Sequence, residues 1–169
     1  MNKKIRIAVL VSGNGTNLQA LINAQKNKII KSGKIELVIS NNSNAFALKR
    51  AEKSKIPFEI ISKKECKKIE EFEKKLKEIL KSYKIELIVL AGFMSVLSKN
   101  FVKDYPKRII NIHPSLIPSF CGKNFYGIKV HEEAIKRGVK ITGATTHFVN
   151  EIIDGGAIIM QKAVKVLDN

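Results

Sequence analysis

The chain alternates short apolar runs with segments in which apolar residues recur every three or four positions. Runs that are apolar on both faces are typical of strands buried in a parallel sheet, and recurrence at three- and four-residue steps is typical of helices. The predicted strands cover residues 5–11, 35–40, 58–61, 85–91 and 108–112. The predicted helices begin near Thr16 or cover residues 45–53, 67–83, 98–103 and 127–137.

The helix predicted at residues 67–83 has the clearest pattern. Its apolar side chains share one face, whereas most of its lysines fall elsewhere. Much of the positive charge of the chain is therefore expected on the solvent-facing side of this helix. The residues on the apolar face are Ile69, Phe72, Leu76, Ile79, Leu80 and Tyr83.

Strands separated by helices indicate an α/β fold, a three-layer sandwich whose mostly parallel sheet carries helices on both faces. The pattern changes after about residue 140, where a short loop joins two predicted strands at residues 141–149 and 157–166. No repeat, linker or low-complexity tract interrupts the sequence, so residues 1–169 are expected to form a single domain. Ligands of such folds bind at the carboxyl ends of the strands. The loops predicted there are residues 12–17, 41–44, 92–95 and 113–124.

Composition fits a globular domain, but the charge is unusual. Hydrophobic residues make up 44% of the 169 residues, which excludes a disordered chain. Lysine and arginine total 31 against 15 aspartate and glutamate, a net charge of +16. This charge indicates either a solvated lysine surface or a face that binds polyanions such as RNA. Only four of the 31 are arginines, the usual residue for phosphate and base recognition, which favours the first interpretation and no nucleic-acid partner.

The sequence also bears on compartment and metal chemistry. No apolar run approaches the ~20 residues of a membrane-spanning helix, so a soluble cytoplasmic protein without a membrane partner is expected. Cys66 and Cys121 lie far apart, with no Cys-x-x-Cys motif and no paired histidines at metal-ligand spacing. Two free thiols and no metal site are therefore expected.

A glycine-rich loop at residues 12–17 joins the first predicted strand to the first helix. Such a loop aims backbone N–H groups at an anion, and the helix N-terminus adds a favourable dipole. Leu18 stands where a dinucleotide fingerprint requires its third glycine, so the loop suits a phosphate monoester instead. The N–H groups expected to hold it belong to Gly15, Thr16 and Asn17. The alternative is an ordinary turn with Thr16 as the helix N-cap.

Asn111 and His113 lie at the end of a predicted strand, in a segment that continues into two prolines. Alternation along a strand places both side chains on one face. An amide donor and a titratable donor that converge there suit stabilisation of an oxyanion in acyl or formyl transfer. A purely structural Asn-x-His at a strand end is the alternative.

Asp154 precedes two glycines in the loop between the last two predicted strands. A carboxylate close to His113 would favour the charged ring and raise its pKa, but Asp-Gly-Gly is also an ordinary hairpin turn. The other two histidines carry different expectations. His131 is expected to be a packing residue on a helix face with Ile128 and Ile135, whereas His147 either lines the site or satisfies a local hydrogen bond.

Four motifs in order make the chain resemble the phosphoribosylglycinamide formyltransferase family over essentially its whole length. Each motif alone is of modest specificity, but their common order and compatible spacing are highly specific. The resemblance implies a single Rossmann-like formyltransferase domain. The motifs are the strand, loop and helix start at residues 7–20, Val-Leu-Ala-Gly-Phe-Met at residues 89–94, Asn-Ile-His-Pro-Ser-Leu-Ile-Pro at residues 111–118, and His-Phe-Val at residues 147–149 with Asp-Gly-Gly at residues 154–156.

The family transfers the formyl group of 10-formyltetrahydrofolate, a cosubstrate, to the amine of 5-phosphoribosylglycinamide in purine biosynthesis, without a metal. The resemblance implies that Asn111 contacts the formyl group, that His113 donates a proton and that Asp154 raises the pKa of His113. The residues implied to bind phosphoribosylglycinamide are Gly15, Thr16 and Asn17. The residues implied to border the pterin ring are Met94, Ser95, Val96 and Leu97.

The chain departs from the family pattern in two places. Ile69 stands where relatives usually carry a folate-contacting arginine. Either lysines such as Lys67 or Lys68 are expected to hold the glutamate tail of the folate, or the tail is held less tightly. Relatives also continue beyond the position of Asn169 into a further helix, so a C-terminally short domain is expected.

Three other functions remain open at this point. Two use the same chemistry, namely formyl transfer to methionyl-tRNA and hydrolysis of formyl-folate. The phosphate loop and the absence of an extra domain in the sequence favour the small nucleotide precursor over both. The third is a non-catalytic basic module that binds RNA. The sequence fits either a monomer or a homodimer.

Overall fold

The computed structural model describes residues 3–62, 66 and 68–167 of the chain. These residues divide into two compact units, one within residues 1–97 and the other within residues 98–169. That the two units act as the single domain expected from the sequence stays a prediction.

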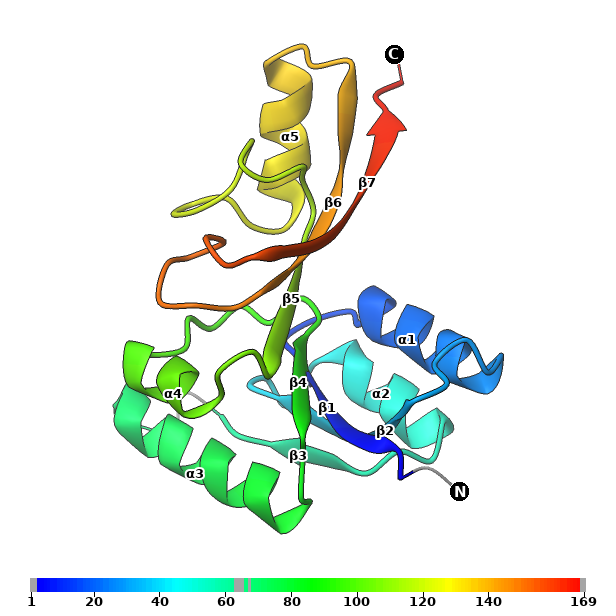
Figure 1. The fold of residues 1–169 in the computed structure, drawn as a ribbon, viewed down its shortest axis with the longest axis vertical. Helices are drawn as coiled ribbons and strands as arrows, with labels where there is room; N and C mark the ends of the chain where they lie inside the picture. The colour runs from blue at the N-terminus through cyan, green and yellow to red at the C-terminus, as the bar shows by residue number, and fades with distance from the viewer. Residues whose placement is uncertain (1–2, 63–65, 67, 168–169) are drawn as a thin grey trace. The chain divides into compact units, whose positions relative to one another are not determined.

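The first unit contains a parallel sheet in the order β3-β2-β1-β4 (Figure 1). Residues 8–11 of its strand β1 are completely buried. Burial on both faces is what the continuous apolar runs predicted, so these predictions are confirmed. The strands are β1 (Ile5–Val11), β2 (Gly33–Ser40), β3 (Phe58–Ile60) and β4 (Leu87–Leu90).

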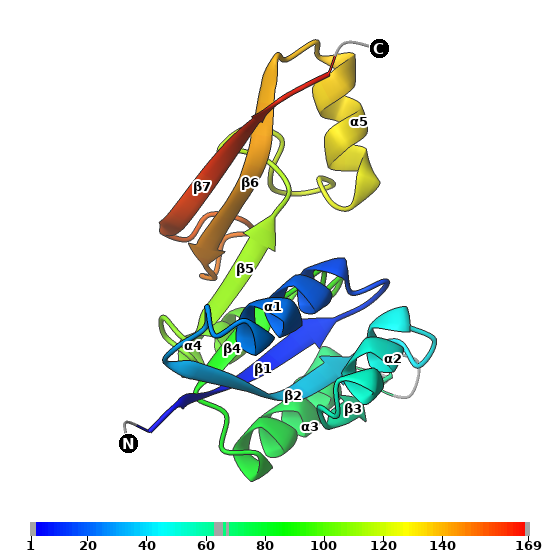
Figure 2. The same ribbon diagram turned by 90° about the vertical axis from the view of Figure 1, so that its right-hand side faces the viewer.

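Helices cover both faces of this sheet. In two views at right angles, α1 and α2 lie on one face and α3 on the other (Figures 1 and 2). Phe72, Leu76 and Leu80 of α3 are buried, as the helical periodicity predicted. Lys67, which the sequence placed in this helix, lies outside the described residues. The bounds are α1 (Thr16–Lys26), α2 (Phe46–Lys53) and α3 (Ile69–Ser82).

The second unit is built on three antiparallel strands in the order β5-β6-β7. The α/β class is thus confirmed, with parallel pairing in the first unit and antiparallel pairing in the second. Every residue of β7 is exposed to solvent. The elements are α4 (Lys99–Asp104), β5 (Ile109–His113), α5 (Ile128–Lys136), β6 (Ile141–Phe148) and β7 (Ile158–Lys165).

The packing role expected for His131 is wrong. His131 is exposed on α5, and its expected companions Ile128 and Ile135 are 73% and 58% exposed. The helix buries Val130 and Ala134 instead. Apolar residues stand at several positions of this helix, so its pattern allows more than one buried stripe, and only tertiary packing selects one.

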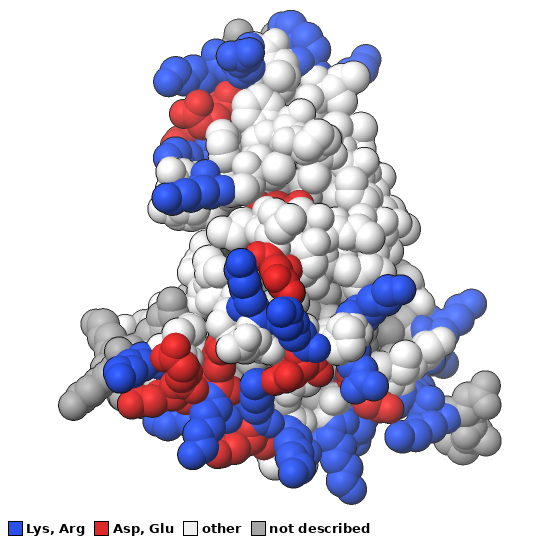
Figure 3. Space-filling model, turned by 60° about the vertical axis from the view of Figure 1, so that its left-hand side comes forward, with Lys and Arg blue, Asp and Glu red and all other residues white. Residues whose placement is uncertain are grey.

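The surface charge is mixed where it can be seen. On the face in Figure 3, lysine and arginine side chains alternate with aspartate and glutamate over the helices of the first unit. Within the described part of the chain, no helix is both long enough and apolar enough to cross a membrane.

Candidate active site

The loops at the carboxyl ends of β1 and β4 are tied to each other. The Ser12 N–H donates to the Gly92 carbonyl at 3.1 Å, and the Ser12 hydroxyl accepts from the Met94 N–H at 2.8 Å. Asn42, which follows β2, donates from its side chain to the Ser12 carbonyl at 3.2 Å. Ser12 therefore fixes the start of the glycine-rich loop against the neighbouring loops of the same sheet edge, where ligands of parallel sheets bind.

The glycine-rich loop has the backbone that an anion site requires. Gly15 adopts a left-handed φ of 70° and is the N-cap of α1, so the alternative in which Thr16 is the N-cap is wrong. A Cβ on Gly15 would lie 2.6 Å from the Cβ of Ala47, so only glycine fits between loop and α2. No side chain caps this end of α1. Its first N–H groups, including those of Thr16 and Asn17, have no partner within the helix and face outward as donors.

Arg50 in α2 supports the same loop, and the sequence reasoning did not identify it. Its Nε donates to the Asn14 carbonyl at 2.8 Å, and its Nη1 donates to the Gln19 side chain at 3.2 Å. The guanidinium also stacks over the Phe46 ring at 4.9 Å. A fixed positive charge thus lies beside the loop. One feature of the sequence could have drawn attention to this residue. Arg50 is one of only four arginines among the 31 basic residues, and arginine is the usual residue for phosphate recognition.

The loop after β4 exposes alternate residues. Met94 and Val96 are 56% and 65% exposed, whereas Ser95 and Leu97 are buried. Asn41 donates to the Ser95 hydroxyl at 2.6 Å, which anchors the loop to the end of β2. The two exposed apolar side chains are therefore presented by a fixed backbone, an arrangement suited to contact with a flat ring system.

In the second unit, β5 presents Asn111 and His113 on one face, as the alternation of the strand predicted. The antiparallel register places Asn111 opposite His147 and His113 opposite Thr145. His113 and His147 are almost completely buried, at 4% and 2% exposure. His113 thus lies in a polar cluster shielded from solvent, and Asn111 is partly buried at its edge.

His113 has an acceptor at each ring nitrogen. Its Nε2 lies 2.8 Å from the Phe120 carbonyl, and its Nδ1 lies 3.5 Å from an oxygen of Asp154. A carbonyl can only accept, so Nε2 of His113 carries the hydrogen of that contact, and the Asp154 carboxylate lies within ion-pair distance of Nδ1. The sequence alone does not show that Asp154 lies beside His113, whereas the structure does.

Asp154 lies in the loop between β6 and β7, with a left-handed φ of 54°. Its carboxylate accepts the Gly122 N–H at 2.9 Å, and its other oxygen lies 3.6 Å from His147 Nε2. Burial by itself would raise the pKa of Asp154, but the hydrogen bond from the Gly122 N–H and the charge of His113 lower it below its ordinary value. Asp154 is thus held as a carboxylate inside the cluster.

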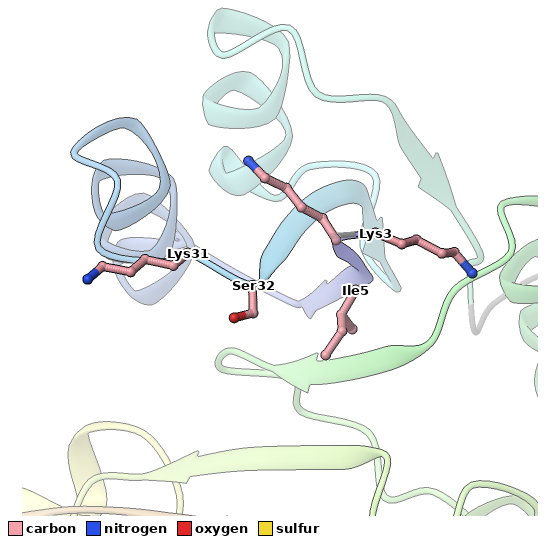
Figure 4. Close-up of a pocket in the computed structure, with 5 residues that line it drawn as sticks. Lys3, Ile5, Lys31 and Ser32 are labelled. Carbon is pink, nitrogen blue, oxygen red and sulfur yellow. The ribbon is translucent and has the colours of Figure 1, made fainter. Parts of the chain in front are cut away.

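A surface hollow elsewhere in the first unit does not belong to these loops. It is lined by Lys3, Lys4, Ile5, Lys31 and Ser32, at the amino end of β1 (Figure 4). The ammonium groups of Lys3 and Lys31 point away from each other, so they do not converge on one ligand. Among the described residues, no group of three or more histidine, cysteine, aspartate or glutamate side chains could hold a metal ion.

Comparison with known proteins defines the class. The formyl transferase family model matches residues 5–169, nearly the whole chain. The chain belongs to the formyl transferase family. Within the family, its resemblance to phosphoribosylglycinamide formyltransferases is confirmed by both sequences and solved structures.

The sequence relatives include single-function and trifunctional proteins. The chain is 42% identical to the phosphoribosylglycinamide formyltransferase of Haemophilus influenzae, over 95% of this chain and 73% of that protein. It is 46% identical to the trifunctional purine biosynthetic protein adenosine-3 of Gallus gallus, over 96% of this chain. It spans 16% of the length of that trifunctional protein.

The solved structures agree. The glycinamide ribonucleotide transformylase 1 of Symbiobacterium toebii superposes with a TM-score of 0.90 at 38% identity, covering 98% of this chain and 75% of that one. A formyltetrahydrofolate deformylase of Pseudomonas syringae superposes with a TM-score of 0.83 at 30% identity, covering 97% of this chain and 52% of that one. The fold is therefore that of formyl-folate enzymes.

Proposed function

We propose that the protein transfers the formyl group of 10-formyltetrahydrofolate to the amine of 5-phosphoribosylglycinamide. The products are formylglycinamide ribonucleotide and tetrahydrofolate, a step of purine biosynthesis. The observation that carries the proposal is the polar cluster of Asn111, His113 and Asp154 in a chain of this family. The relatives from Gallus gallus and Haemophilus influenzae share 46% and 42% identity with it along most of its length.

The chemistry proposed for the cluster follows from its donors. The amine attacks the formyl carbon, and negative charge develops on the formyl oxygen. Asn111 and His113 supply hydrogen bonds to that oxygen, and a proton from the His113 ring reaches the departing folate nitrogen as its bond to the formyl carbon breaks. The proton that the attacking amine loses replaces the one that His113 gave. An ionised Asp154 beside His113 favours a proton on the ring. Because the His113 Nε2 contacts the Phe120 carbonyl, that hydrogen bond must be exchanged for one to the substrate.

The binding roles proposed for the first unit rest on the loops described above and on the resemblance. The N–H groups of Gly15, Thr16 and Asn17 hold the phosphate, with Arg50 as a supporting charge. The exposed Met94 and Val96 contact the pterin ring, while Ser95 and Leu97 keep their loop in place. Lys68, exposed at the start of α3, is the described lysine proposed to attract the glutamate tail of the folate.

The proposal includes small-molecule substrates, no metal, and neither nucleic acid nor membrane as partner. A cytoplasmic location is proposed because this step supplies cellular purine synthesis. Either a monomer or a homodimer is compatible with it.

A second candidate function is hydrolysis of formyl-folate. The observation that favours it is the similarity to the deformylase from Pseudomonas syringae. In that reaction water replaces the amine as the nucleophile, while the oxyanion and the leaving group stay the same. The phosphate loop supported by Arg50 favours the amine substrate, because hydrolysis has no use for a phosphate site.

The experiment is an assay of the 169-residue chain with 10-formyltetrahydrofolate, with and without phosphoribosylglycinamide. Tetrahydrofolate release that depends on the amine substrate is expected. His113→Ala should lower kcat by about 10²- to 10⁴-fold, as loss of a general acid does, while His131→Ala, at an exposed histidine, should leave it unchanged. Folate release at the same rate without the amine would favour the hydrolase, and no reaction with either nucleophile would reject both.

A further inference from the structure

A second histidine, His147, contacts the catalytic cluster without a role in the proposed chemistry. It faces Asn111 across the β5–β6 pair, with 3.2 Å between its Nε2 and the amide nitrogen of Asn111. Its Nδ1 lies 2.9 Å from the Phe148 carbonyl. Its Nε2 also lies 3.6 Å from Asp154, beyond ordinary hydrogen-bond length. His147 is 2% exposed, so water does not compete for these contacts.

The contacts of the ring determine its tautomer. The Phe148 carbonyl can only accept, so Nδ1 of His147 carries a hydrogen. A neutral ring then has a lone pair on Nε2, which accepts one N–H of the Asn111 amide. This hydrogen bond holds the amide nitrogen of Asn111 toward His147 and leaves its second N–H to donate elsewhere.

The charge balance of the cluster supports the neutral ring. Asp154 supplies one negative charge, and its two oxygens lie 3.5 Å from His113 Nδ1 and 3.6 Å from His147 Nε2. The nearby Cys121 adds none, because burial and then Asp154 raise the pKa of its thiol. A second positive charge on His147 would have to share the single negative charge of Asp154 with His113, which is unfavourable in a cluster shielded from water.

Resting on the proposed function, we propose that His147 is a positioning residue for Asn111. Its neutral, Nδ1-protonated ring accepts one amide N–H of Asn111 through Nε2, so that the other N–H is directed at the formyl oxygen. The two buried histidines thus have different roles. His113 carries the proton that is transferred, and His147 stays neutral and orients the second donor.

Two substitutions separate the Nε2 contact from a general packing role. The side chain of His147→Gln places an amide oxygen near the position of Nε2, whereas that of His147→Asn reaches only as far as Nδ1. His147→Asn should lower kcat by about 10- to 100-fold. This loss is smaller than the roughly 10²- to 10³-fold expected when an oxyanion donor is removed completely. The KM of each of the two substrates should change little. His147→Gln should restore most of kcat. Equal losses in both variants, or losses in KM alone, would overturn the proposal.

A double-mutant cycle tests whether His147 acts through Asn111. In an Asn111→Ala background, the donor that His147 orients is gone, so adding His147→Asn should lower kcat by less than about 3-fold. The full loss in both backgrounds would show that His147 acts independently of Asn111. His131→Gln is the matched control at an exposed histidine, and the melting temperature of each variant shows whether it folds.

A final measurement does not depend on the reaction. Nitrogen-15 NMR of the ring nitrogens should show that Nδ1 of His147 is protonated and Nε2 is unprotonated near neutral pH. Asn111→Ala should shift the Nε2 signal of His147 and leave the signals of His131 in place. A proton on Nε2 would overturn the proposal even in an active enzyme. If NMR shows the expected tautomer but the chain does not catalyse formyl transfer, the hydrogen bond between His147 and Asn111 is supported and the proposed function is rejected.

Discussion

At Asp154, two opposing effects act on one carboxylate. Burial opposes ionisation, while the Gly122 N–H and the charge of His113 favour it and lower the pKa of Asp154. A left-handed φ of 54°, uncommon for a residue with a side chain, places the carboxylate there. Backbone strain of this kind persists only where the surroundings hold it, and it is frequent at functional sites.

The lowered pKa of Asp154 predicts a pH dependence of stability. A carboxyl group whose pKa is lower in the folded chain stabilises the fold above its unfolded pKa, about 3.9, and this contribution is lost as pH falls through the folded pKa. Asp154→Asn should therefore lower the free energy of unfolding by about 1–3 kcal/mol near neutral pH. Denaturant titrations at several pH values should show this difference shrinking below about pH 4. A difference that grows as pH falls would contradict the assignment.

At the scale of elements, the loops at the carboxyl ends of β1, β2 and β4 hold one another. Ser12 bonds to the loop after β4, Asn41 bonds to Ser95, and the Ala47 N–H at the start of α2 donates to the Gly13 carbonyl at 3.1 Å. The glycine-rich loop is thus fixed before any ligand arrives. Preorganisation of this kind reduces the ordering penalty of binding.

Close packing of loop and helix predicts the effect of a methyl group at Gly15. Gly15→Ala would place a Cβ 2.6 Å from Ala47 and would force an alanine into a left-handed backbone. The free energy of unfolding should fall by about 1–3 kcal/mol, and KM for phosphoribosylglycinamide should rise. Gly13→Ala is the matched control, because a Cβ there meets no atom within 4 Å. Equal stability of the two variants, measured by denaturant unfolding, would show that the contact is unimportant.

The contact of Arg50 with the loop carbonyl predicts a selective binding defect. Arg50→Gln removes the charge and the hydrogen bond to the Asn14 carbonyl. KM for phosphoribosylglycinamide should rise by about 10-fold, equivalent to the ~1.4 kcal/mol of one charge-assisted hydrogen bond, while KM for the folate stays unchanged. Lys53→Gln is the control, at an exposed cation on the same helix. Steady-state kinetics with each substrate varied in turn would detect a general loss of affinity, which would contradict the assignment.

For the whole molecule, the net charge of +16 is the dominant feature. Its lysines attract anions of every kind, which raises the encounter rate with phosphorylated and carboxylated substrates. On the face in Figure 3, acidic side chains interrupt the positive charge over the first unit. A continuous basic groove is therefore not visible on that face.

The charge distribution predicts weak RNA binding that has no role in activity. Any affinity for single-stranded RNA should fall with salt, with a log–log slope near −0.7 per phosphate contacted, and formyl transfer should be unaffected by added RNA at physiological salt. A fluorescence anisotropy series across salt concentrations, run beside the enzyme assay, measures both. Tight RNA binding that persists at physiological salt would favour the basic-module interpretation instead.

Much of the architecture could be predicted because strands and helices leave local patterns. The apolar run of β1 and the heptad-like face of α3 predicted both elements to within a few residues. His131 could not be predicted, because α5 has apolar residues in more than one direction. The adjacency of Asp154 and His113 could not be predicted either, because no local sequence pattern specifies how the chain between them folds back.

The sequence by itself determined the α/β class, the order of the elements and the formyl transferase family. Backbone sterics and burial act on residues close together in the chain, so they leave periodic patterns and ordered motifs. Only the tertiary structure decided that His147 meets Asn111, which lies 36 residues away, and that Arg50 supports the glycine-rich loop. The contact between His147 and Asn111 depends on strand register, because a shift of one residue would turn each side chain to the opposite face of its strand. The contact of Arg50 depends on the packing of α2 against the loop.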